Sequence, residues 1–164
     1  MNKQILIHFP WEILIDWHKK HERKTLPWRQ YTVFPEDILL YRVWLSEILL
    51  QQTQASRVIS FFERIVERYP TIRSLSETDY ETFFPYYQWL WYYSRAKNLL
   101  KTAHIISTEF LWTFPNNIDL LKKLPWVWEY TANAILAFWY GETTLSWDTN
   151  LEKVFARYYN GTKE

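Results

Sequence analysis

Apolar residues recur every three to four positions along almost the whole chain, and this helical periodicity limits the fold more than any other feature of the sequence. The segment 94–110 shows it most clearly, with an inward stripe formed by Ala96, Leu99, Leu100, Ala103 and Ile106. No stretch of useful length alternates apolar and polar residues in the way that a half-buried strand does. The sequence therefore predicts an all-α protein of roughly eight helices.

Breaking and capping residues set the expected boundaries of these helices. The main breaks are Pro27, Pro70, Gly141 and a polar cluster at 51–54. Ser76 is expected to be the N-cap of a helix that has Asp79 at its third position. The first helix is expected to be amphipathic, with a stripe of Trp11, Leu14, Ile15 and His18.

Composition limits the classes of protein to which the chain can belong. Its 164 residues suffice for one domain or two small lobes, and its net charge of +1 does not by itself indicate a nucleic-acid partner. The sequence contains no cysteine, which excludes disulfides and cysteine-ligated zinc or iron–sulfur sites within these residues. The histidines lack metal-ligand spacing, so we expect no metal site.

No apolar run approaches the roughly 20 residues that a membrane-spanning helix needs. The N-terminal segment contains only a short apolar stretch, which Pro10 and Glu12 interrupt, and it has no small-residue cleavage site. We therefore expect a cytoplasmic protein without a signal peptide or a membrane partner.

Several stretches, taken together and in order, resemble one family. They are LPWR (26–29), YRVWLSEILLQQTQASRVISFFERIVERYPTI (41–72), YYSRAKNLLKTA (92–103), FPNNIDLLKKLP (114–125), YTANAILAF (130–138) and DTNLEKVFAR (148–157). The sequence is similar to the MutY-type adenine DNA glycosylases, which belong to the helix-hairpin-helix glycosylases. The match covers nearly the whole chain, and SEILLQQTQ is a highly specific part of it.

The resemblance implies a helical fold with a six-helix barrel lobe and a second lobe built from both ends of the chain. Residues 1–30 would begin the second lobe, residues 31–141 would form the barrel with a helix-hairpin-helix at about 117–140, and residues 142–164 would return to the second lobe. The family pattern also implies a monomer that removes adenine mispaired with 8-oxoguanine or guanine in double-stranded DNA. Full-length relatives carry a 4Fe–4S cluster after the last helix seen here, so we expect a chain truncated before that cluster and no cofactor within it.

Two carboxyl groups are the candidate catalytic residues. Apolar neighbours one turn from Glu47 favour a raised pKa; they include Val43, Trp44 and Leu50. The resemblance assigns Glu47 as the acid that protonates adenine N7, and Asp148 as the anion that stabilises the oxocarbenium-like cation. Asn150 matches a position that helps to hold Asp148. The alternative for Glu47 is a solvated helix glutamate. The alternative for Asp148 is an N-cap that stabilises its helix by about 1 kcal/mol.

Tyr130 determines the predicted reaction subtype. The related endonuclease III-type enzymes have lysine at the matching position, which forms a Schiff base and then cuts the strand. Tyrosine cannot form an imine, and Lys122 and Lys123 lie out of register on the preceding helix. The resemblance therefore implies a monofunctional glycosylase that uses water, and the alternative is a tyrosine that only packs in its helix.

Further positions match family residues that contact DNA or adenine. A base inside the duplex stack is out of reach, so residues that enter the duplex are mechanically required. Gln52 and Tyr92 match such wedges. Trp28 and Arg29 match residues near the adenine pocket. The hairpin positions that the resemblance assigns to DNA binding are Trp126, Val127, Trp128 and Thr131. The alternative without a DNA contact is a glutamine at a helix break for Gln52, a core tyrosine for Tyr92 and a buried tryptophan for Trp28.

Glycine and tryptophan occur in unusual numbers. The chain has two glycines and eleven tryptophans, whereas average usage predicts about eleven glycines. Family glycines fall on the tryptophans at 89, 91, 112, 126 and 128. At the hairpin, glycine permits positive φ and lets backbone N–H groups approach a DNA phosphate.

A single cause can explain all five replacements. The codon UGA is one base from the glycine codon GGA, and different bacterial lineages read it as glycine or as tryptophan. We hypothesise that these positions are glycine in the cell. The alternatives are a real aromatic hairpin and a decayed, inactive copy.

Three functions remain open from the sequence. The first is an adenine-specific mismatch glycosylase. The second is a thymine-mismatch or other monofunctional glycosylase of the same superfamily, because the core motifs are partly shared. The third is a catalytically inert DNA-binding fragment.

Overall fold

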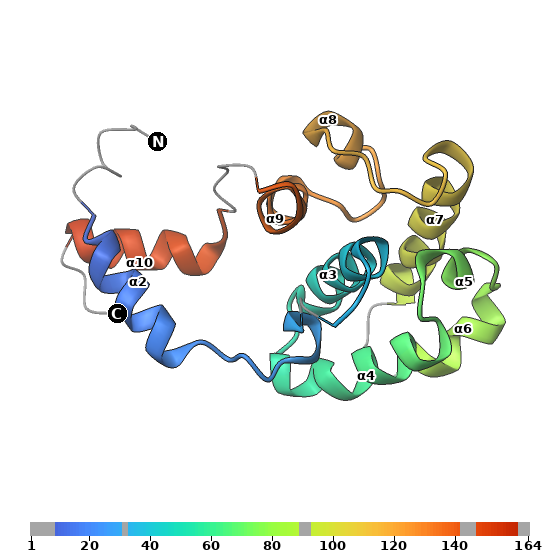
Figure 1. The fold of residues 1–164 in the computed structure, drawn as a ribbon, viewed down its shortest axis with the longest axis horizontal. Coiled ribbons are helices and arrows are strands. Elements are labelled where there is room, and N and C mark those ends of the chain that lie inside the picture. Colours follow the sequence, from blue (N-terminus) through green and yellow to red (C-terminus); the bar gives the residue numbers. More distant parts are fainter. Residues whose placement is uncertain (1–8, 31–32, 89–92, 142–146, 161–164) are drawn as a thin grey trace.

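The computed structural model describes residues 9–30, 33–88, 93–141 and 147–160. Within these ranges the chain forms nine α-helices, one 3-10 helix and no strand, which confirms the all-α prediction. In chain order the elements are α2 (Trp11–His21), η1 (Pro27–Arg29), α3 (Glu36–Leu50), α4 (Ala55–Arg68), α5 (Ile72–Ser76), α6 (Tyr80–Tyr87), α7 (Tyr93–Glu109), α8 (Ile118–Leu121), α9 (Glu129–Tyr140) and α10 (Thr149–Asn160). Figure 1 shows α3 in the middle of the larger group of helices.

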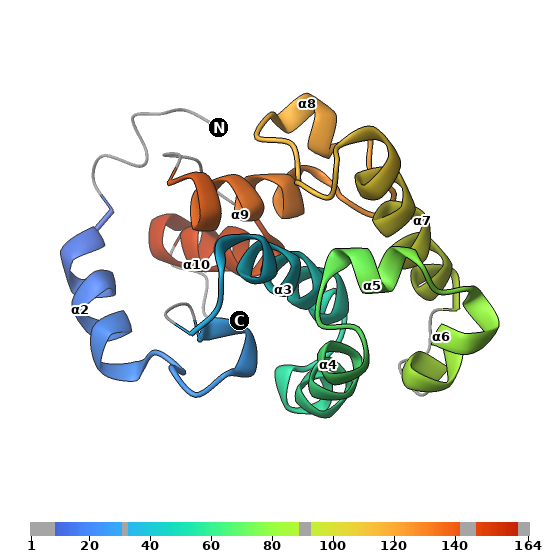
Figure 2. The ribbon, with the colours of Figure 1, turned by 45° about the vertical axis from the view of Figure 1, so that its right-hand side comes forward.

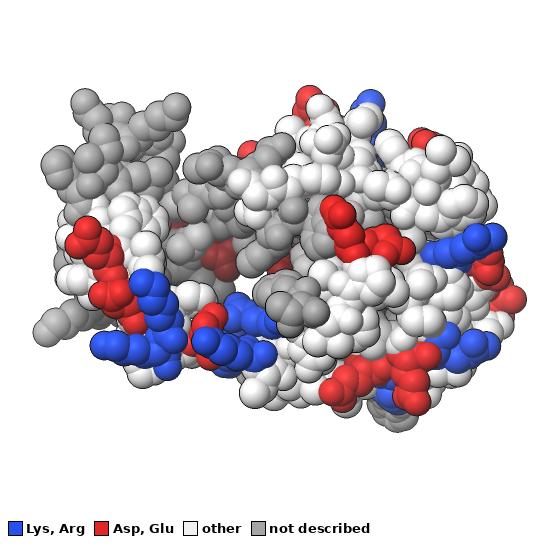
Figure 3. Space-filling view, viewed as in Figure 1, with Lys and Arg blue, Asp and Glu red and all other residues white. Residues whose placement is uncertain are grey.

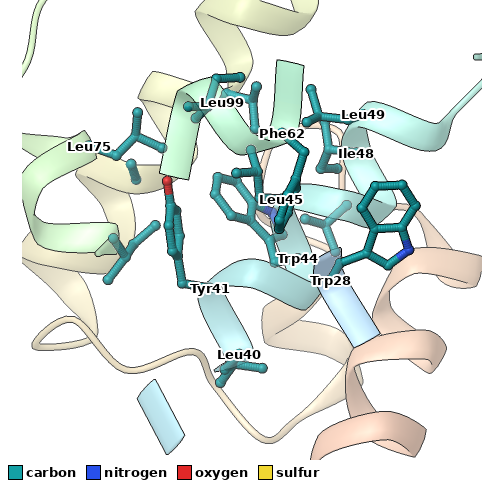
Figure 4. Close-up of a cluster of buried hydrophobic side chains, with 14 of the residues drawn as sticks. Trp28, Leu40, Tyr41, Trp44, Leu45, Ile48, Leu49, Phe62, Leu75 and Leu99 are labelled. Carbon is teal, nitrogen blue, oxygen red and sulfur yellow. The ribbon is translucent and has the colours of Figure 1, made fainter. Parts of the chain in front are cut away.

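Helix α3 is the centre of the hydrophobic core. Ten of its 15 residues are buried, so the helix is apolar on nearly every side, as expected only in an interior position. It packs against α4, α7, α9 and η1, and Figure 2 shows it running beside α9. Tyr41, Trp44 and Leu45 have no exposed surface, and Figure 4 shows them among Phe62 and Leu99. This packing fixes the position of α3, and with it the positions of the few polar side chains that the helix carries.

The helices around α3 mostly form where the sequence predicts them. The polar break at 51–54 separates α3 from α4. Gly141 ends α9 in a left-handed conformation with φ of +63°, which glycine adopts without steric cost. On the inward stripe of α7, four of the five predicted residues are buried and Leu100 is half-buried.

The predicted cap at Ser76 was wrong. Ser76 is the last residue of α5, which begins with a capping box between Thr71 and Ser74. Asp79 is the true N-cap of α6, where its Oδ1 accepts a hydrogen bond of 2.8 Å from the backbone N–H of Thr82. Both serine and aspartate favour N-caps, so local sequence could not separate one helix from two short ones.

Helices α2 and α10 come from opposite ends of the described chain and are in contact (Figure 1). The ring of Phe155 on α10 lies 4.6 Å from that of Phe9 and 5.9 Å from that of Trp11, between centroids. Helix α2 forms, but it ends at His21, before the predicted break at Pro27, and none of its residues is buried. Of its expected apolar stripe, only Trp11 packs against another ring, whereas Leu14, Ile15 and His18 are exposed. The division of the chain into lobes at residues 30 and 141 stays a prediction.

Candidate active site

A cavity of about 190 Å³ lies between η1, α3 and α9. Its polar and aromatic lining groups are Arg23, Trp28, Arg29, Ser46, Glu47 and Tyr130. The structure thus brings together four predicted site residues that are far apart in the sequence. A larger hollow of about 500 Å³ lies between α6 and α7, but no carboxyl group lines it, so we centre the site on the smaller cavity.

Glu47 is the acid of this cavity. Burial raises the pKa of its carboxyl from the ordinary value of 4.5 to about 7, although a hydrogen bond with Tyr130 and the charge of Arg29 oppose part of this rise. At neutral pH a large fraction of Glu47 is therefore protonated. A half-buried carboxylic acid with a pKa near the working pH is suited to donating a proton.

Asp148 lies directly before α10 and is held by two hydrogen bonds. Its Oδ1 accepts one of 2.7 Å from the backbone N–H of Leu151, and its Oδ2 accepts one of 2.9 Å from the side-chain amide of Asn150. Asp148 therefore has the local geometry of an N-cap, with Asn150 fixing the carboxylate as expected. The charge of Asp148 also contributes to raising the pKa of Glu47 and of Tyr130, whereas Asp148 itself is not among the residues that line the cavity.

Tyr130 lies in the first turn of α9, against Glu47. Burial raises the pKa of its phenol well above the usual range, and the nearby charges of Glu47 and Asp148 raise it further. The phenol therefore stays neutral. Lys122 is exposed and forms an ion pair of 3.7 Å with Glu129, outside the cavity. No lysine is among the residues that line the cavity.

The predicted DNA-contacting segments lie at two turns. Gln52 is exposed in the turn between α3 and α4, with a φ of +56°. Tyr92 lies outside the described residues. In the hairpin before α9, Trp128 is 61% exposed and Val127 is buried, and Thr131 in the first turn of α9 is buried as well. The DNA contacts of these residues stay predictions.

The rings of Trp126 and Trp128 stack at the entrance to α9. Their centroids are 5.6 Å apart and their planes differ by 19°. Trp128 is the N-cap of α9, so the stacked rings lie beside the backbone N–H groups with which a helix N-terminus binds an anion. The chain as written therefore carries two indoles where the family pattern has two glycines.

Two of the five tryptophans at family glycine positions have a left-handed backbone. The φ angle is +62° at Trp112 and +61° at Trp126, a region that bulky residues rarely adopt because of steric crowding at Cβ. Both positions therefore fit glycine better than tryptophan. At Trp128 the φ of −87° suits any residue, so the backbone gives no support there. Positions 89 and 91 lie outside the described residues.

The tryptophans at positions 28 and 44 behave differently. Trp44 has no exposed surface and its ring lies 5.5 Å from that of Phe114. Trp28 is 7% exposed and meets the edge of Phe62 at 5.3 Å. Both rings fill the core, so glycine at either position would leave a large cavity.

Sequence reasoning missed two polar residues that support the site, Gln51 and Arg95. Arg95 on α7 is fully buried, and its guanidinium reaches the end of α3. A signal was present, because Arg95 falls one turn before Leu99 on the inward stripe of α7. A charged residue on such a stripe needs partners, but the sequence does not say which.

Lys and Arg side chains gather over the C-terminal part of α2 and the segment that follows it (Figure 3). This segment leads to the cavity, where Arg23 and Arg29 are lining residues. A local basic patch therefore exists on a chain with a net charge of +1. Such patches attract the phosphates of nucleic acids.

The described residues contain neither a candidate membrane span nor a candidate metal-binding cluster. None of the helices in this part of the chain is long and apolar enough to cross a membrane. In the same ranges, no three residues of the types His, Cys, Asp or Glu are grouped in a way that could hold a metal ion.

The fold and site together define a helical protein in which a hairpin between two helices lies beside a cavity containing a protonated acid. Residues 45–164 match the family described as HhH-GPD superfamily base excision DNA repair protein. The chain belongs to this superfamily.

Individual proteins show the same relationship. The chain is 37% identical over 150 residues to an adenine DNA glycosylase of Buchnera aphidicola, and the match covers 92% of this chain and 41% of that protein. It is 33% identical to the human adenine DNA glycosylase, over 88% of this chain and 27% of the relative. The chain spans less than half the length of these curated relatives.

Solved structures confirm the fold. A thermostable thymine-DNA glycosylase superposes with a TM-score of 0.77 at 21% identity, covering 92% of this chain and 68% of that one. A non-covalent complex of endonuclease III with DNA superposes with a TM-score of 0.74 at 20% identity, covering 94% and 68%.

Proposed function

We propose that this chain forms the catalytic part of a monofunctional DNA glycosylase that removes adenine mispaired with 8-oxoguanine or guanine. The observation that carries the proposal is the cavity, in which Glu47 has a pKa of about 7 and lies against the phenol of Tyr130. The adenine DNA glycosylases that match most of the chain support the choice of base. Duplex DNA is the partner, and the protein acts as a monomer.

The two carboxyl groups divide the chemistry between them. The adenine is flipped out of the duplex, since its atoms cannot be reached in the stack. Glu47 gives its proton to N7, and the bond between C1′ and N9 then breaks with its electron pair going to adenine. Asp148, as an anion held by Asn150 and Leu151, stabilises the positive charge left on the sugar. Water adds to C1′, and its proton passes to a carboxylate.

Tyr130 limits the reaction to base removal. A phenol cannot form the imine through which a lysine cuts the strand. The reaction therefore ends at an abasic site. The 164 residues contain no cysteine and thus offer no thiolate to the iron–sulfur cluster expected in longer relatives, so we assign no step to a cluster.

Single-turnover excision from labelled duplexes tests the proposal. We expect abasic sites at adenine opposite 8-oxoguanine and none at thymine opposite guanine. Replacing Glu47 with glutamine, or Asp148 with asparagine, should lower the rate by about a hundredfold or more, because each removes one half of the carboxylate pair. The matched control is Glu63→Gln, at an exposed glutamate on α4. Each protein is also tested with glycine at positions 126 and 128.

Other results would select another function. Excision of thymine opposite guanine would favour the thymine-mismatch alternative. Binding without excision of either base, with and without the glycines, would favour an inert DNA-binding fragment. A rate within tenfold of the parent for either carboxylate variant would contradict the paired-carboxylate mechanism.

A further inference from the structure

Arg95 ties helix α7 to the last turn of α3. Its side chain is fully buried, and its guanidinium donates hydrogen bonds of 3.3 Å to the carbonyl of Leu49 and 2.7 Å to that of Gln51. The final carbonyls of a helix have no partner within the helix and carry its negative dipole end. A buried guanidinium supplies hydrogen-bond donors to these carbonyls and a positive charge to the dipole end. Its hydrogen bonds are charge-assisted and therefore stronger than neutral ones.

The bonds from Arg95 fix the turn that follows α3. Gln51 is the C-cap of α3, and the next residue, Gln52, has a φ of +56° and is exposed. Left-handed backbone is unfavourable for a residue with a side chain, so it persists where neighbouring contacts hold it. The contact from Arg95 to the carbonyl of Gln51 is directly adjacent to Gln52.

The side chain of Gln51 extends the connection to the hairpin. Its amide Nε2 lies 3.4 Å from the carbonyl of Trp126 and 3.3 Å from the hydroxyl of Thr131, to both of which it donates. The bond to residue 126 is made by the backbone and does not depend on the indole. Helix α7 also contacts this hairpin directly, because the hydroxyl of Thr102 donates a hydrogen bond of 3.0 Å to the carbonyl of Pro125.

These contacts connect the catalytic groups to the predicted DNA-contacting turns. Glu47 lies one helical turn before Gln51 on α3, and Tyr130 directly precedes Thr131 on α9. The bond from Gln51 to Thr131 therefore joins the two helices that place the acid and the phenol in one cavity. The same residue adjoins Gln52 and reaches the hairpin at 126.

We propose that Arg95 is a positioning residue, which acts through Gln51 to hold the turn at Gln52, the hairpin at 126–131 and the Glu47–Tyr130 pair in one geometry. This inference rests on the proposed glycosylase function for its catalytic consequence. Its structural part is independent of that function.

Hydrogen exchange of the whole chain tests the structural part. Two backbone amides are the reporters: that of Thr53, which donates to Leu50, and that of Val127, which donates to Leu124, both at 3.1 Å. With Arg95→Met, exchange of both should become about tenfold faster or more, while amides within α4 stay unchanged. Arg95→Lys keeps a charge and should recover part of the protection. Lys101→Met, at an exposed residue of α7, is the matched control and should change nothing.

A second variant separates the two connections. Gln51→Leu removes only the amide that reaches the hairpin and leaves the backbone carbonyl that Arg95 binds. It should accelerate exchange at Val127 but not at Thr53. Equal acceleration of exchange at all amides of Arg95→Met would show that Arg95 only stabilises the fold, and it would overturn the proposal. Unchanged exchange at Thr53 or at Val127 in Arg95→Met would overturn it as well. If Arg95→Met does not fold, Arg95→Lys tests both reporters and Gln51→Leu tests the hairpin reporter Val127 alone.

Excision measurements test the catalytic part. At saturating protein, the single-turnover rate of Arg95→Met should fall at least about tenfold with an unchanged pH midpoint, since the acid remains but is misplaced. A rate equal to that of the parent would overturn the positioning role. If the parent itself excises nothing while the local exchange changes occur, the proposed function fails and the connection through Arg95 stands.

Discussion

Replacing Glu47 with glutamine should change how the stability of the fold depends on pH. In the unfolded chain the carboxyl has its ordinary pKa of 4.5, whereas burial raises the pKa to about 7 in the folded protein. The folded protein therefore binds this proton more tightly than the unfolded chain does. The stabilisation that results is fully present below pH 4.5 and is lost as the pH rises through 7.

The size of the effect follows from these two values. A rise in pKa from 4.5 to about 7 corresponds to about 3 kcal/mol of stability, of which about 2.5 kcal/mol is lost between pH 5 and pH 9. Glutamine does not titrate. The unfolding free energy of Glu47→Gln, relative to that of the parent, should therefore increase by about 2.5 kcal/mol from pH 5 to pH 9.

Urea denaturation of Glu47→Gln and of the parent at pH 5 and pH 9 measures this difference. The contributions of titratable groups that the two proteins share cancel in the subtraction. Glu63→Gln is the control, because an exposed helix position should give a difference within about 0.5 kcal/mol at both pH values. A change for Glu47→Gln below about 0.5 kcal/mol, or one of opposite sign, would refute the reasoning. The carboxyl would then be solvated, and the argument for a neutral acid in the cavity would fail.

Three further outcomes follow from Tyr130 and from the tryptophans. Borohydride should trap no covalent adduct between the chain and DNA and no strand should be cut, because Tyr130 cannot form an imine; a trapped adduct detected by gel shift would contradict the monofunctional mechanism. Glycine at both 126 and 128 should tighten duplex binding about tenfold or more in a fluorescence titration, because it removes the stacked indoles from the start of α9. Unchanged affinity would count against a phosphate site there. The gene should have UGA at positions 89, 91, 112, 126 and 128 and UGG at Trp28 and Trp44; UGG at 126 and 128 would end the recoding hypothesis.

Local patterns predicted the helices well where one signal dominated. The polar cluster at 51–54 and the single Gly141 each ended a helix at the expected place. The raised pKa of Glu47 was also predictable, because its neighbours along α3 are apolar and the helix is buried. The error at Ser76 arose where two good capping residues lay close together and the tertiary contacts decided between them.

Features that depend on contacts between distant helices were not predictable. Arg95 was visible as a charge on an apolar stripe, but its partners lie more than 40 residues away at the end of α3. The bond from Gln51 to Thr131 spans 80 residues. Positive φ at Trp126 was anticipated only through the family glycine, since tryptophan itself signals nothing of the kind.

Because Asp148 lies at the start of α10, the proposed catalytic residues belong to two parts of the fold that bury different amounts of apolar surface. Glu47 and Tyr130 lie on α3 and α9, which pack directly on each other in the core. Helix α10 instead contacts α2 through aromatic rings, and α2 buries none of its residues. Regions that bury little apolar surface open first on warming. We therefore expect heating to separate Asp148, the proposed sugar-stabilising anion, from Glu47, so that the proposed chemistry is lost while most of the helices remain folded.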